Sequence, residues 1–386
     1  MEQHLPLTAA APVRVLCIED RVPTPCLDGA SARKLRIVLT LRRLGCPVTL
    51  LPHGALRFEP FLSSVATDIA RLEAAGVEVP TSPAIPSPEH FLAERGHDFD
   101  LVLMSPYSIA HVYLPLVRRY APAAVAVYCS MDLGHVQHFR RARFTRKVPD
   151  LRRALEAKAW ETALASSTDA TLVCSEEERS TLLAHCPDAD VRVVRHVVEP
   201  VAAAATFEQR KGLLFLGSFA HFANVDAIEH FVGEVLPLVR QAIPAVTLTV
   251  VGSDPRDDVS KLAGDAVLVT GWASDLAPHF AKARIFVAPL RYGAGIKIKV
   301  LDSFAHGVPV ILTPVAAEGL CLRDGESALV AATPGAFAEA VIRLYRDSRL
   351  WSHLARGGFS LLERHFSQQA MDSALSEVLA LVRARG

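Results

Sequence analysis

The sequence predicts two doubly wound, Rossmann-like α/β domains that face each other across a cleft. Short runs rich in Val, Ile and Leu alternate with helix-length stretches from one end of the chain to the other, which is typical of parallel sheets covered by helices. The alternation stops between residues 199 and 211 and then starts again. With 386 residues, the chain has room for two domains that each bury a core.

The first 199 residues contain six apolar runs that predict buried strands. They are residues 13–18, 48–51, 101–104, 124–128, 170–174 and 191–194. Helical spacing fills the gaps between them, as in residues 149–166. A turn at Asp28 and Gly29 precedes the helix predicted over 30–44, and Gly45 ends that helix. We therefore assign residues 1–199 to an N-terminal domain.

Residues 200–211 show neither helical nor strand periodicity, so we interpret them as a linker. Residues 212–365 repeat the alternating pattern and form the second predicted domain. Its strands are predicted at residues 212–216, 246–251, 266–269, 285–289 and 308–312, with helices that begin near residues 225, 274, 296 and 335. Ligands bind such sheets at the carboxyl ends of the strands, so two facing sheets create a cleft between those ends.

The last segment, residues 366–386, predicts an amphipathic helix that Ser367 can cap. Its apolar stripe consists of Met371, Leu375, Val378, Leu379 and Val382. Such a stripe must be buried, and the second sheet already has enough helices for both of its faces. We therefore expect this helix to cross back onto the N-terminal domain.

The composition excludes several classes of protein. Lys and Arg total 41 and Asp and Glu total 41, so bulk charge gives no support for nucleic-acid binding. No apolar run approaches the length that spans a bilayer, and we identify no signal peptide. The seven cysteines show no C-x-x-C spacing, which favours a reduced, cytoplasmic protein. The two D-x-D pairs, at 98–100 and 188–190, precede strands, so we expect no metal site there.

The segment from Arg291 to Pro309 is the most informative for function. Gly293 and Gly295 permit close backbone approach, and a helix is predicted to start directly after them. The first N–H groups of a helix bind anions, and Lys297 adds positive charge there. A phosphate at the helix start, with the Asp302 carboxylate near sugar hydroxyls, would hold a nucleotide. The alternative is an ordinary connection with solvated lysines.

This segment resembles the retaining GT-B glycosyltransferases of the group 1 type (glycosyltransferase family 4). The matching residues are Gly293, Gly295, Lys297, Lys299, Asp302, Ala305, Gly307, Pro309, Val310, Thr313, Glu318, Gly319 and Leu320. The resemblance extends to residues 214–227, to residues 270–276 and to the first strand–helix turn at 20–31. It implies an N-terminal domain on the acceptor side and a C-terminal domain on the donor side.

The resemblance also implies site residues. The donor would contact Gly217, His221, Asn224, Trp272, Gly293, Ala294, Gly295, Ile296 and Asp302. Lys297, Asp132 and His135 would act in catalysis, and Asp28, Gly29 and Ser31 would form an acceptor or phosphate loop. Two features depart from the family pattern: Ala294 stands where the family has a glutamate, and residues 218–224 contain no Arg or Lys. Lys297 is therefore the leading diphosphate ligand.

The implied activity is transfer of a sugar, with retention and without a metal or other cofactor, from a nucleotide diphosphate sugar to an acceptor hydroxyl in bacterial glycan synthesis. The acceptor would be a saccharide or a lipid-linked sugar. One alternative is an epimerase or phosphorylase on the same fold. Another is an inactive nucleotide-binding partner subunit, which Ala294 favours. The basic run from Arg140 to Lys158 is either a solvated helix face or a contact with an anionic acceptor or the inner membrane.

Overall fold

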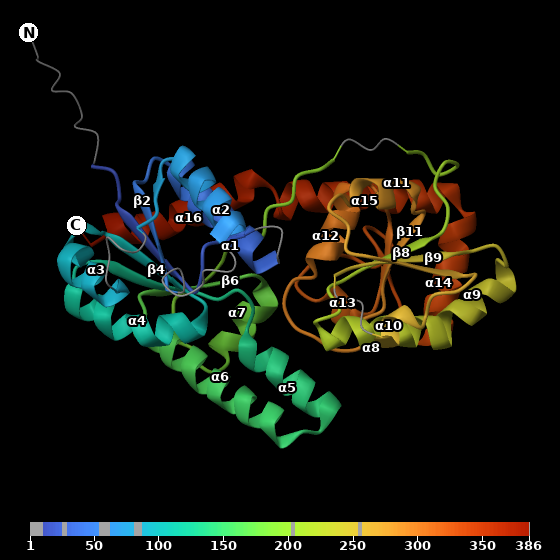
Figure 1. Ribbon diagram of the computed structural model, residues 1–386, viewed down its shortest axis with the longest axis horizontal. Coiled ribbons are helices and arrows are strands. Elements are labelled where there is room, and N and C mark those ends of the chain that lie inside the picture. Colours follow the sequence, from blue (N-terminus) through green and yellow to red (C-terminus); the bar gives the residue numbers. More distant parts are fainter. Residues whose placement is uncertain are drawn as a thin grey trace, which may run out of the picture.

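The computed structural model describes residues 11–24, 29–53, 62–80, 87–201, 205–253 and 257–385. Over these ranges the chain forms two parallel sheets packed between helices, which confirms the predicted fold class (Figure 1). The two domains lie side by side along the long axis of the molecule. Asp28, one of the predicted acceptor-loop residues, lies outside the described residues.

The N-terminal sheet has the order β3-β2-β1-β4-β5-β6-β7. Its strands are β1 (Val15–Glu19), β2 (Val48–Pro52), β3 (Val77–Glu78), β4 (Leu101–Ser105), β5 (Val125–Cys129), β6 (Ala170–Val173) and β7 (Val191–Val193). The second sheet has the order β10-β9-β8-β11-β12-β13. Its strands are β8 (Leu213–Leu216), β9 (Leu248–Val251), β10 (Val267–Gly271), β11 (Ile285–Ala288), β12 (Val310–Leu312) and β13 (Leu329–Val330). The predicted strands are all present, and the two-residue edge strands β3 and β13 are additional.

Helices connect the strands in both domains. In the first they are α1 (Gly29–Arg43), α2 (Leu62–Ala74), α3 (Pro88–Arg95), α4 (Tyr107–Tyr120), α5 (Gly134–Thr145), α6 (Val148–Ser167) and α7 (Glu176–Leu183). In the second they are α8 (Phe222–His230), α9 (Leu236–Ala242), α10 (Asp257–Ser260), α11 (Ala277–Lys282), α12 (Ile298–Ala305), α13 (Pro314–Ala317), α14 (Pro334–Arg346) and α15 (Ser348–His365), and α16 (Gln368–Arg383) follows. None of the helices in the described ranges is long and apolar enough to cross a membrane.

The central strands are apolar on both faces because helices cover both sides of the sheet. Successive side chains of a strand point to opposite faces. In β1, Val15 and Cys17 pack in one core cluster, while Leu16 and Ile18 pack in another on the opposite side. This double burial explains why the strands appear in the sequence as continuous apolar runs.

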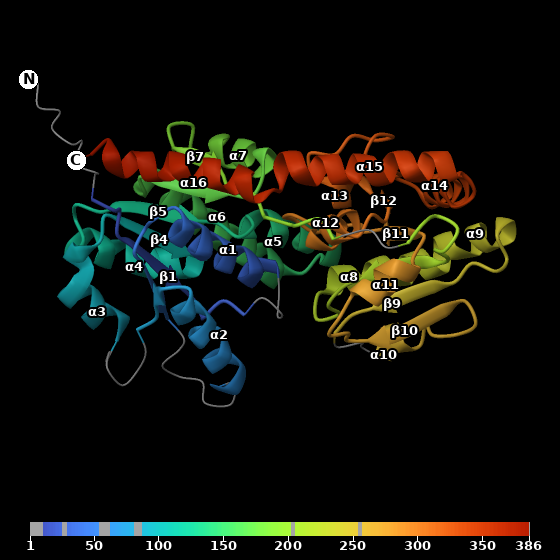
Figure 2. The same cartoon turned by 90° about the horizontal axis from the view of Figure 1, so that it is seen from above.

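Helix α16 joins the core of the N-terminal domain. Its Met371, Leu375 and Val378 are buried in the same cluster as β1 and α1. Gln368 Nε2 donates to Thr40 Oγ1 of α1 at 2.8 Å, and Arg43 of α1 pairs with Asp372. Figure 2 shows α15 and α16 in line along one side of both domains. The chain therefore connects the domains twice, through residues 198–211 and through the α15–α16 junction.

Leu375→Ala is expected to destabilise the N-terminal domain. Leu375 is fully buried there, and truncation of a buried Leu costs about 2–5 kcal/mol. Hydrogen exchange should show lost protection in β1 and β2, with β8 and β11 unchanged. Ser376→Ala, at the exposed neighbouring position of the same helix, is the matched control. Equal loss of protection in both sheets would contradict the assignment of α16 to the first domain.

Candidate functional site

The glycine loop after β11 meets the N-terminal domain at Asp132. Gly295 has φ of +72°, a conformation that favours glycine. A Cβ atom on Gly295 would lie 1.8 Å from Oδ1 of Asp132, which belongs to the loop after β5. Only a glycine therefore lets the two loops come this close. The backbone amide of Ile296 also hydrogen-bonds the Asp132 carboxylate.

The glycine loop that leads into α12 thus already binds the Asp132 carboxyl group through the amide of Ile296, two residues before the helix begins at Ile298. Burial and then the neighbouring Glu178 carboxylate raise the pKa of Asp132 to about 7, although Lys297, Arg33 and the Ile296 amide oppose the shift. A carboxyl group with this pKa exchanges its proton near neutral pH. The predicted anion site at the glycine loop and the predicted catalytic residue Asp132 are therefore in direct contact.

Lys297 lies inside the glycine loop. Its side chain is 8% exposed, and Nζ donates to the carbonyl oxygens of Gly295 at 2.5 Å and Ala294 at 3.1 Å. Burial lowers the pKa of Lys297, and the Asp132 carboxylate partly counteracts this effect. The lysine is positioned to neutralise negative charge at the helix start.

A second cation lies where β8 meets α12. Lys299 Nζ donates to Asn224 Oδ1 at 2.6 Å and lies 4.7 Å from the centroid of the Phe215 ring. A Cβ atom on Gly217 would lie 2.7 Å from Asn224 Cγ and 3.0 Å from Lys299 Nζ, so Gly217 permits this packing. Burial, followed by the charge of Lys297, lowers the pKa of Lys299 to about 7. Residues 218–224, which follow β8, contain no Lys or Arg. Lys299 of α12 places a basic side chain beside them, through its bond to Asn224.

Three predicted donor contacts lie apart from these clusters. No partner among the described residues is found for the carboxylate of Asp302, and burial raises its pKa to about 7. Trp272, directly after β10, is 66% exposed, and His221 is exposed at the start of α8. These side chains have groups available for a ligand, but the structure gives them no contact with Lys297.

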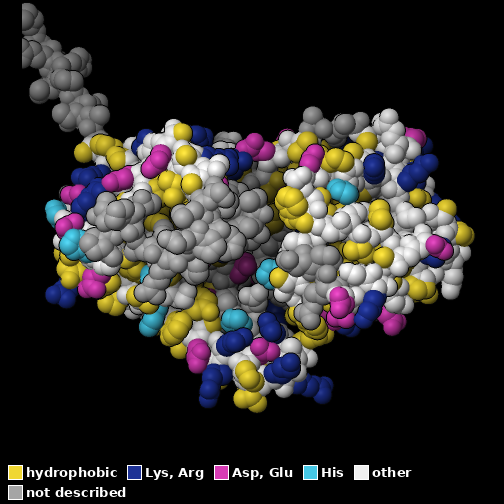
Figure 3. Space-filling view, viewed as in Figure 1, with side chains coloured by type: hydrophobic (Ala, Val, Ile, Leu, Met, Phe, Trp, Pro, Cys, Tyr) yellow, Lys and Arg dark blue, Asp and Glu magenta, His cyan; other side chains and the backbone are white. Residues whose placement is uncertain are grey.

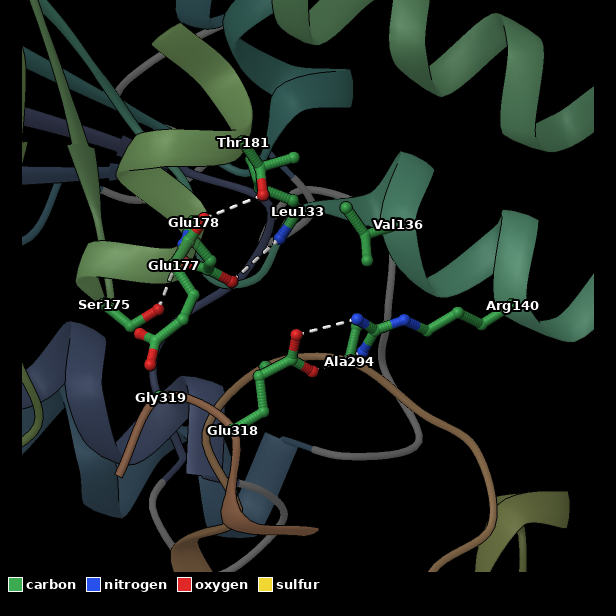
Figure 4. A pocket seen from close by; sticks show the side chains of 11 residues that line it. Leu133, Val136, Arg140, Ser175, Glu177, Glu178, Thr181, Ala294, Glu318 and Gly319 are labelled. Atoms are coloured by element: carbon green, nitrogen blue, oxygen red, sulfur yellow. Dashed lines mark hydrogen bonds and ion pairs between the residues drawn. The ribbon is translucent and has the colours of Figure 1, made fainter. Parts of the chain in front are cut away.

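Arg140 of α5 reaches across the cleft to the second domain. Its Nη1 donates to the carbonyl oxygen of Gly293 at 2.6 Å, and its guanidinium forms a bidentate pair with Glu318, with Nη2 to Oε1 at 2.7 Å. Residues of both domains line a cavity at this point, among them Leu133, Val136, Arg140, Ser175, Glu177, Glu178, Thr181, Ala294, Gly295, Glu318 and Gly319. Figure 4 shows Glu318 and Arg140 pointing toward each other beside Ala294.

The start of α5 is fixed by the buried carboxylate of Glu161. Glu161 accepts hydrogen bonds from the amides of Gly134 at 2.7 Å and His135 at 3.1 Å, and from His135 Nδ1 at 2.5 Å. The His135 ring also contacts Phe139 and His185 and is 3% exposed. The predicted catalytic role of His135 therefore stays a prediction, for a side chain that is buried against Glu161. Its imidazole holds α5 against α6, and it does not line the cavity.

The predicted acceptor loop lies beside the start of α12. A Cβ atom on Gly29 would lie 2.8 Å from Cγ1 of Ile298, so α1 and α12 begin next to each other. Ser31, two residues further on, is buried. This arrangement brings the first turn of the N-terminal domain to the same edge as the glycine loop.

The sequence pattern predicts no contact between Arg140 and Glu318 and gives no role to Glu178. In the structure its carboxylate accepts from the amides of Cys174 at 2.8 Å and Leu133 at 3.2 Å, which joins the loop after β6 to the loop of Asp132. A signal for Glu318 was available, since it belongs to the recognised motif. No local pattern indicates that Arg140 is its partner.

Comparisons with known proteins agree with this architecture. Residues 210–347 match the family described as "Glycosyl transferases group 1". The lipopolysaccharide core biosynthesis glycosyltransferase LpsE of Rhizobium meliloti is 32% identical over 146 residues, which cover 36% of this chain and 43% of LpsE. An uncharacterized 44.6 kDa protein in the cps region of Klebsiella pneumoniae is 24% identical over 172 residues, or 42% of this chain and 44% of that protein. The alignments thus span less than half of these relatives.

Solved structures match over nearly the whole chain. Sucrose-phosphate synthase from Thermosynechococcus elongatus has a TM-score of 0.72 at 18% identity, covering 97% of this chain and all of that one. HepE from Anabaena, solved with UDP and glucose, has a TM-score of 0.66 at 14% identity, covering 95% and 99%. At these identities the likeness concerns the fold. The chain has the GT-B fold, and within its second domain residues 210–347 are similar to the group 1 glycosyl transferases.

Arg140→Gln is expected to open the cleft. The Arg140–Glu318 pair is about one-third exposed, so its loss removes about 1 kcal/mol and shifts an open–closed equilibrium about fivefold toward the open form. Small-angle X-ray scattering should then report a larger radius of gyration. Arg323→Gln, which breaks an exposed pair within the second domain, is the control. An unchanged radius for Arg140→Gln would show that the pair does not hold the domains together.

Proposed function

We propose that this chain, a GT-B protein whose second domain is similar to the group 1 glycosyl transferases, is a glycosyltransferase that moves a sugar from a nucleotide diphosphate sugar to an acceptor hydroxyl. The observation that carries the proposal is the start of α12, where Lys297 and the Ile296 amide face Asp132 across the cleft. A helix start with an enclosed cation suits a diphosphate leaving group. The relatives point to bacterial glycan synthesis, because LpsE acts in lipopolysaccharide core biosynthesis.

Lys297, Lys299 and the first amides of α12 would stabilise the diphosphate. Burial lowers the pKa of both lysines, and a bound diphosphate would favour their charged forms. Asp302, whose carboxylate lacks a partner in the described residues, would accept hydrogen bonds from the ribose. Trp272 would flank the base. HepE, with UDP and glucose bound, supports a donor of this class.

The transfer would proceed with retention and without a metal. In this scheme the leaving diphosphate departs from one face of the sugar, and one of its oxygens takes the proton of the acceptor hydroxyl that attacks from the same face. The protein then has two tasks: to stabilise the departing charge and to hold the reactants together. Asp132 would contact the donor sugar, and Arg140 would hold the cleft closed.

The acceptor would be a saccharide or a lipid-linked sugar bound at the N-terminal domain, beside Gly29 and Ser31. The proposal places the enzyme in the cytoplasm, in peripheral contact with the inner membrane, where lipid-linked acceptors are found. Ala294 also permits a second function, that of a nucleotide-binding subunit without transferase activity, because the glutamate of the family pattern is missing there. An assay that separates donor binding from transfer distinguishes the two.

The test is a thermal-shift screen of nucleotide sugars followed by a transfer assay. One nucleotide sugar at 100 times its dissociation constant should stabilise the protein by about 2.7 kcal/mol. Transfer of its sugar to an acceptor should continue in excess EDTA. Binding without transfer to any acceptor would favour the inactive subunit. Loss of transfer in EDTA, restored by Mg²⁺ or Mn²⁺, would overturn metal independence.

Lys297→Ala is expected to weaken donor binding by about 10- to 150-fold, because a hydrogen bond to a charged group is worth about 1.5–3 kcal/mol. Isothermal titration calorimetry with the nucleotide sugar measures the change. Lys282→Ala, at an exposed position in α11, is the matched control. Unchanged affinity in a folded Lys297→Ala protein would remove Lys297 from the site.

A further inference from the structure

The α5–α6 hairpin exposes an apolar stripe. Val148, Leu151 and Leu155 of α6 are 76%, 43% and 56% exposed. Their spacing of three and four residues places them on one side of the helix, away from Ala154 and Ala157, which are buried against the domain. Large apolar side chains gathered at this exposure mark an interaction surface.

The same hairpin is strongly basic. Residues 134–167, all of them described, contain eight Lys and Arg against three Asp and Glu, whereas the whole chain has 41 of each. Two of the eight are paired, Arg140 with Glu318 and Arg141 with Asp150. No ion pair to a described residue is found for the other six, which are Arg143, Arg146, Lys147, Arg152, Arg153 and Lys158. Glu156 is the one exposed carboxylate of the hairpin.

The hairpin extends away from both sheets, below the junction of the domains in Figure 1. In Figure 3 the basic side chains gather over this projection, with apolar side chains among them. On α6 the helical spacing places Arg152 on one flank of the apolar stripe and Lys158 on the other. An apolar stripe between cations is the pattern of a helix that lies in a lipid–water interface.

We propose that the outer face of this hairpin docks on an anionic lipid surface. Val148, Leu151 and Leu155 would enter the boundary between headgroups and acyl chains, and the cations that flank the stripe on α6, Arg152 and Lys158, would face the lipid phosphates. Neither the apolar stripe nor the cations would bind a membrane stably alone, because the stripe is short and exposed cations are screened by salt. Together they provide two signals, as stable peripheral binding requires.

The charge argues against a second copy of the chain as the occupant. A symmetric dimer through the stripe would place the same patch of each subunit against its partner. Arg152 and Lys158 of one hairpin would then face those of the other, with Glu156 as the only exposed acid in each hairpin. An anionic membrane supplies the opposite charge over the whole face.

Lipid docking of the hairpin would bring the enzyme to a lipid-linked acceptor. This role of the docking surface rests on the proposed function. Helix α5 begins directly after Asp132 and Leu133, so the hairpin and the cleft share one rigid element. The lipid binding itself does not require transfer. It can therefore be measured on the full chain with no nucleotide sugar present.

The experiment is co-sedimentation of the full chain with vesicles of phosphatidylcholine alone or with phosphatidylglycerol added. The protein should bind only the anionic vesicles. Each Lys or Arg near an anionic surface contributes about fivefold, so Arg152→Gln with Lys158→Gln should lower the partition coefficient about 30-fold. Leu151→Gln with Leu155→Gln should also weaken binding. Matched controls at exposed positions of the second domain are Leu268→Gln and the pair Arg323→Gln with Arg349→Gln.

The proposal is overturned by absence of binding to anionic vesicles, by equal binding to neutral ones, or by controls that lose as much binding as the hairpin variants. It is also overturned if light scattering shows a dimer that the Leu151→Gln and Leu155→Gln changes convert to a monomer, because the stripe is then a protein interface. Transfer to a soluble acceptor should be unchanged in the hairpin variants. Loss of vesicle binding with transfer intact therefore leaves the proposed function standing.

Discussion

The buried guanidinium of Arg33 fixes the N-terminal side of the cleft. A charge in the interior is costly unless hydrogen bonds and opposite charges compensate it. Arg33 is 1% exposed and donates to the carbonyl oxygens of Ser130 and Val194, both at 2.7 Å. One side chain on α1 thereby ties together the segments that follow β5 and β7. The carboxylates of Glu178 and Asp132 lie close enough to stabilise its charge. The position of Asp132 therefore depends on a buried cation of α1.

The two halves of the cleft have opposite electrostatic character. The second domain presents the first amides of α12 with Lys297 and Lys299, and the first domain presents Asp132 and Glu178. In the structure Asp132 lies against the glycine loop and bonds the Ile296 amide, whereas the Arg140–Glu318 pair has the reverse polarity, with its cation on the first domain. An anionic ligand that enters would compete with Asp132 for the same amide. The near-neutral pKa of Asp132 lowers the cost of that exchange, because the carboxyl group can take up a proton as the ligand binds.

The sequence predicts those parts of the site whose residues lie close together along the chain, and it does not predict contacts between residues that are far apart in the sequence. The strands are visible because burial on both faces leaves continuous apolar runs, whereas β3 and β13 have two residues each and leave no pattern. Gly293, Gly295 and Lys297 could be identified because they lie in one segment with a helix start. The Arg140–Glu318 pair joins positions 178 residues apart, which no local pattern encodes. His135 has a suitable side chain for catalysis, but Glu161, 26 residues further on, sets the direction of its ring.

Helix α5 connects the chemistry of the cleft with the basic hairpin. At 1.5 Å per residue, its 12 residues span about 18 Å, from the loop of Asp132 to the hairpin tip. Between these ends, Arg140 contacts the glycine loop, and Phe144 stacks on Tyr292 of the second domain with ring centroids 4.3 Å apart. Helix α5 is therefore held at its first residue by Glu161. It also contacts the second domain through Arg140 and Phe144. A tilt of the hairpin relative to the N-terminal sheet would change the contacts of Arg140 and Phe144 with the second domain, so the proposed surface binding would be coupled to domain closure.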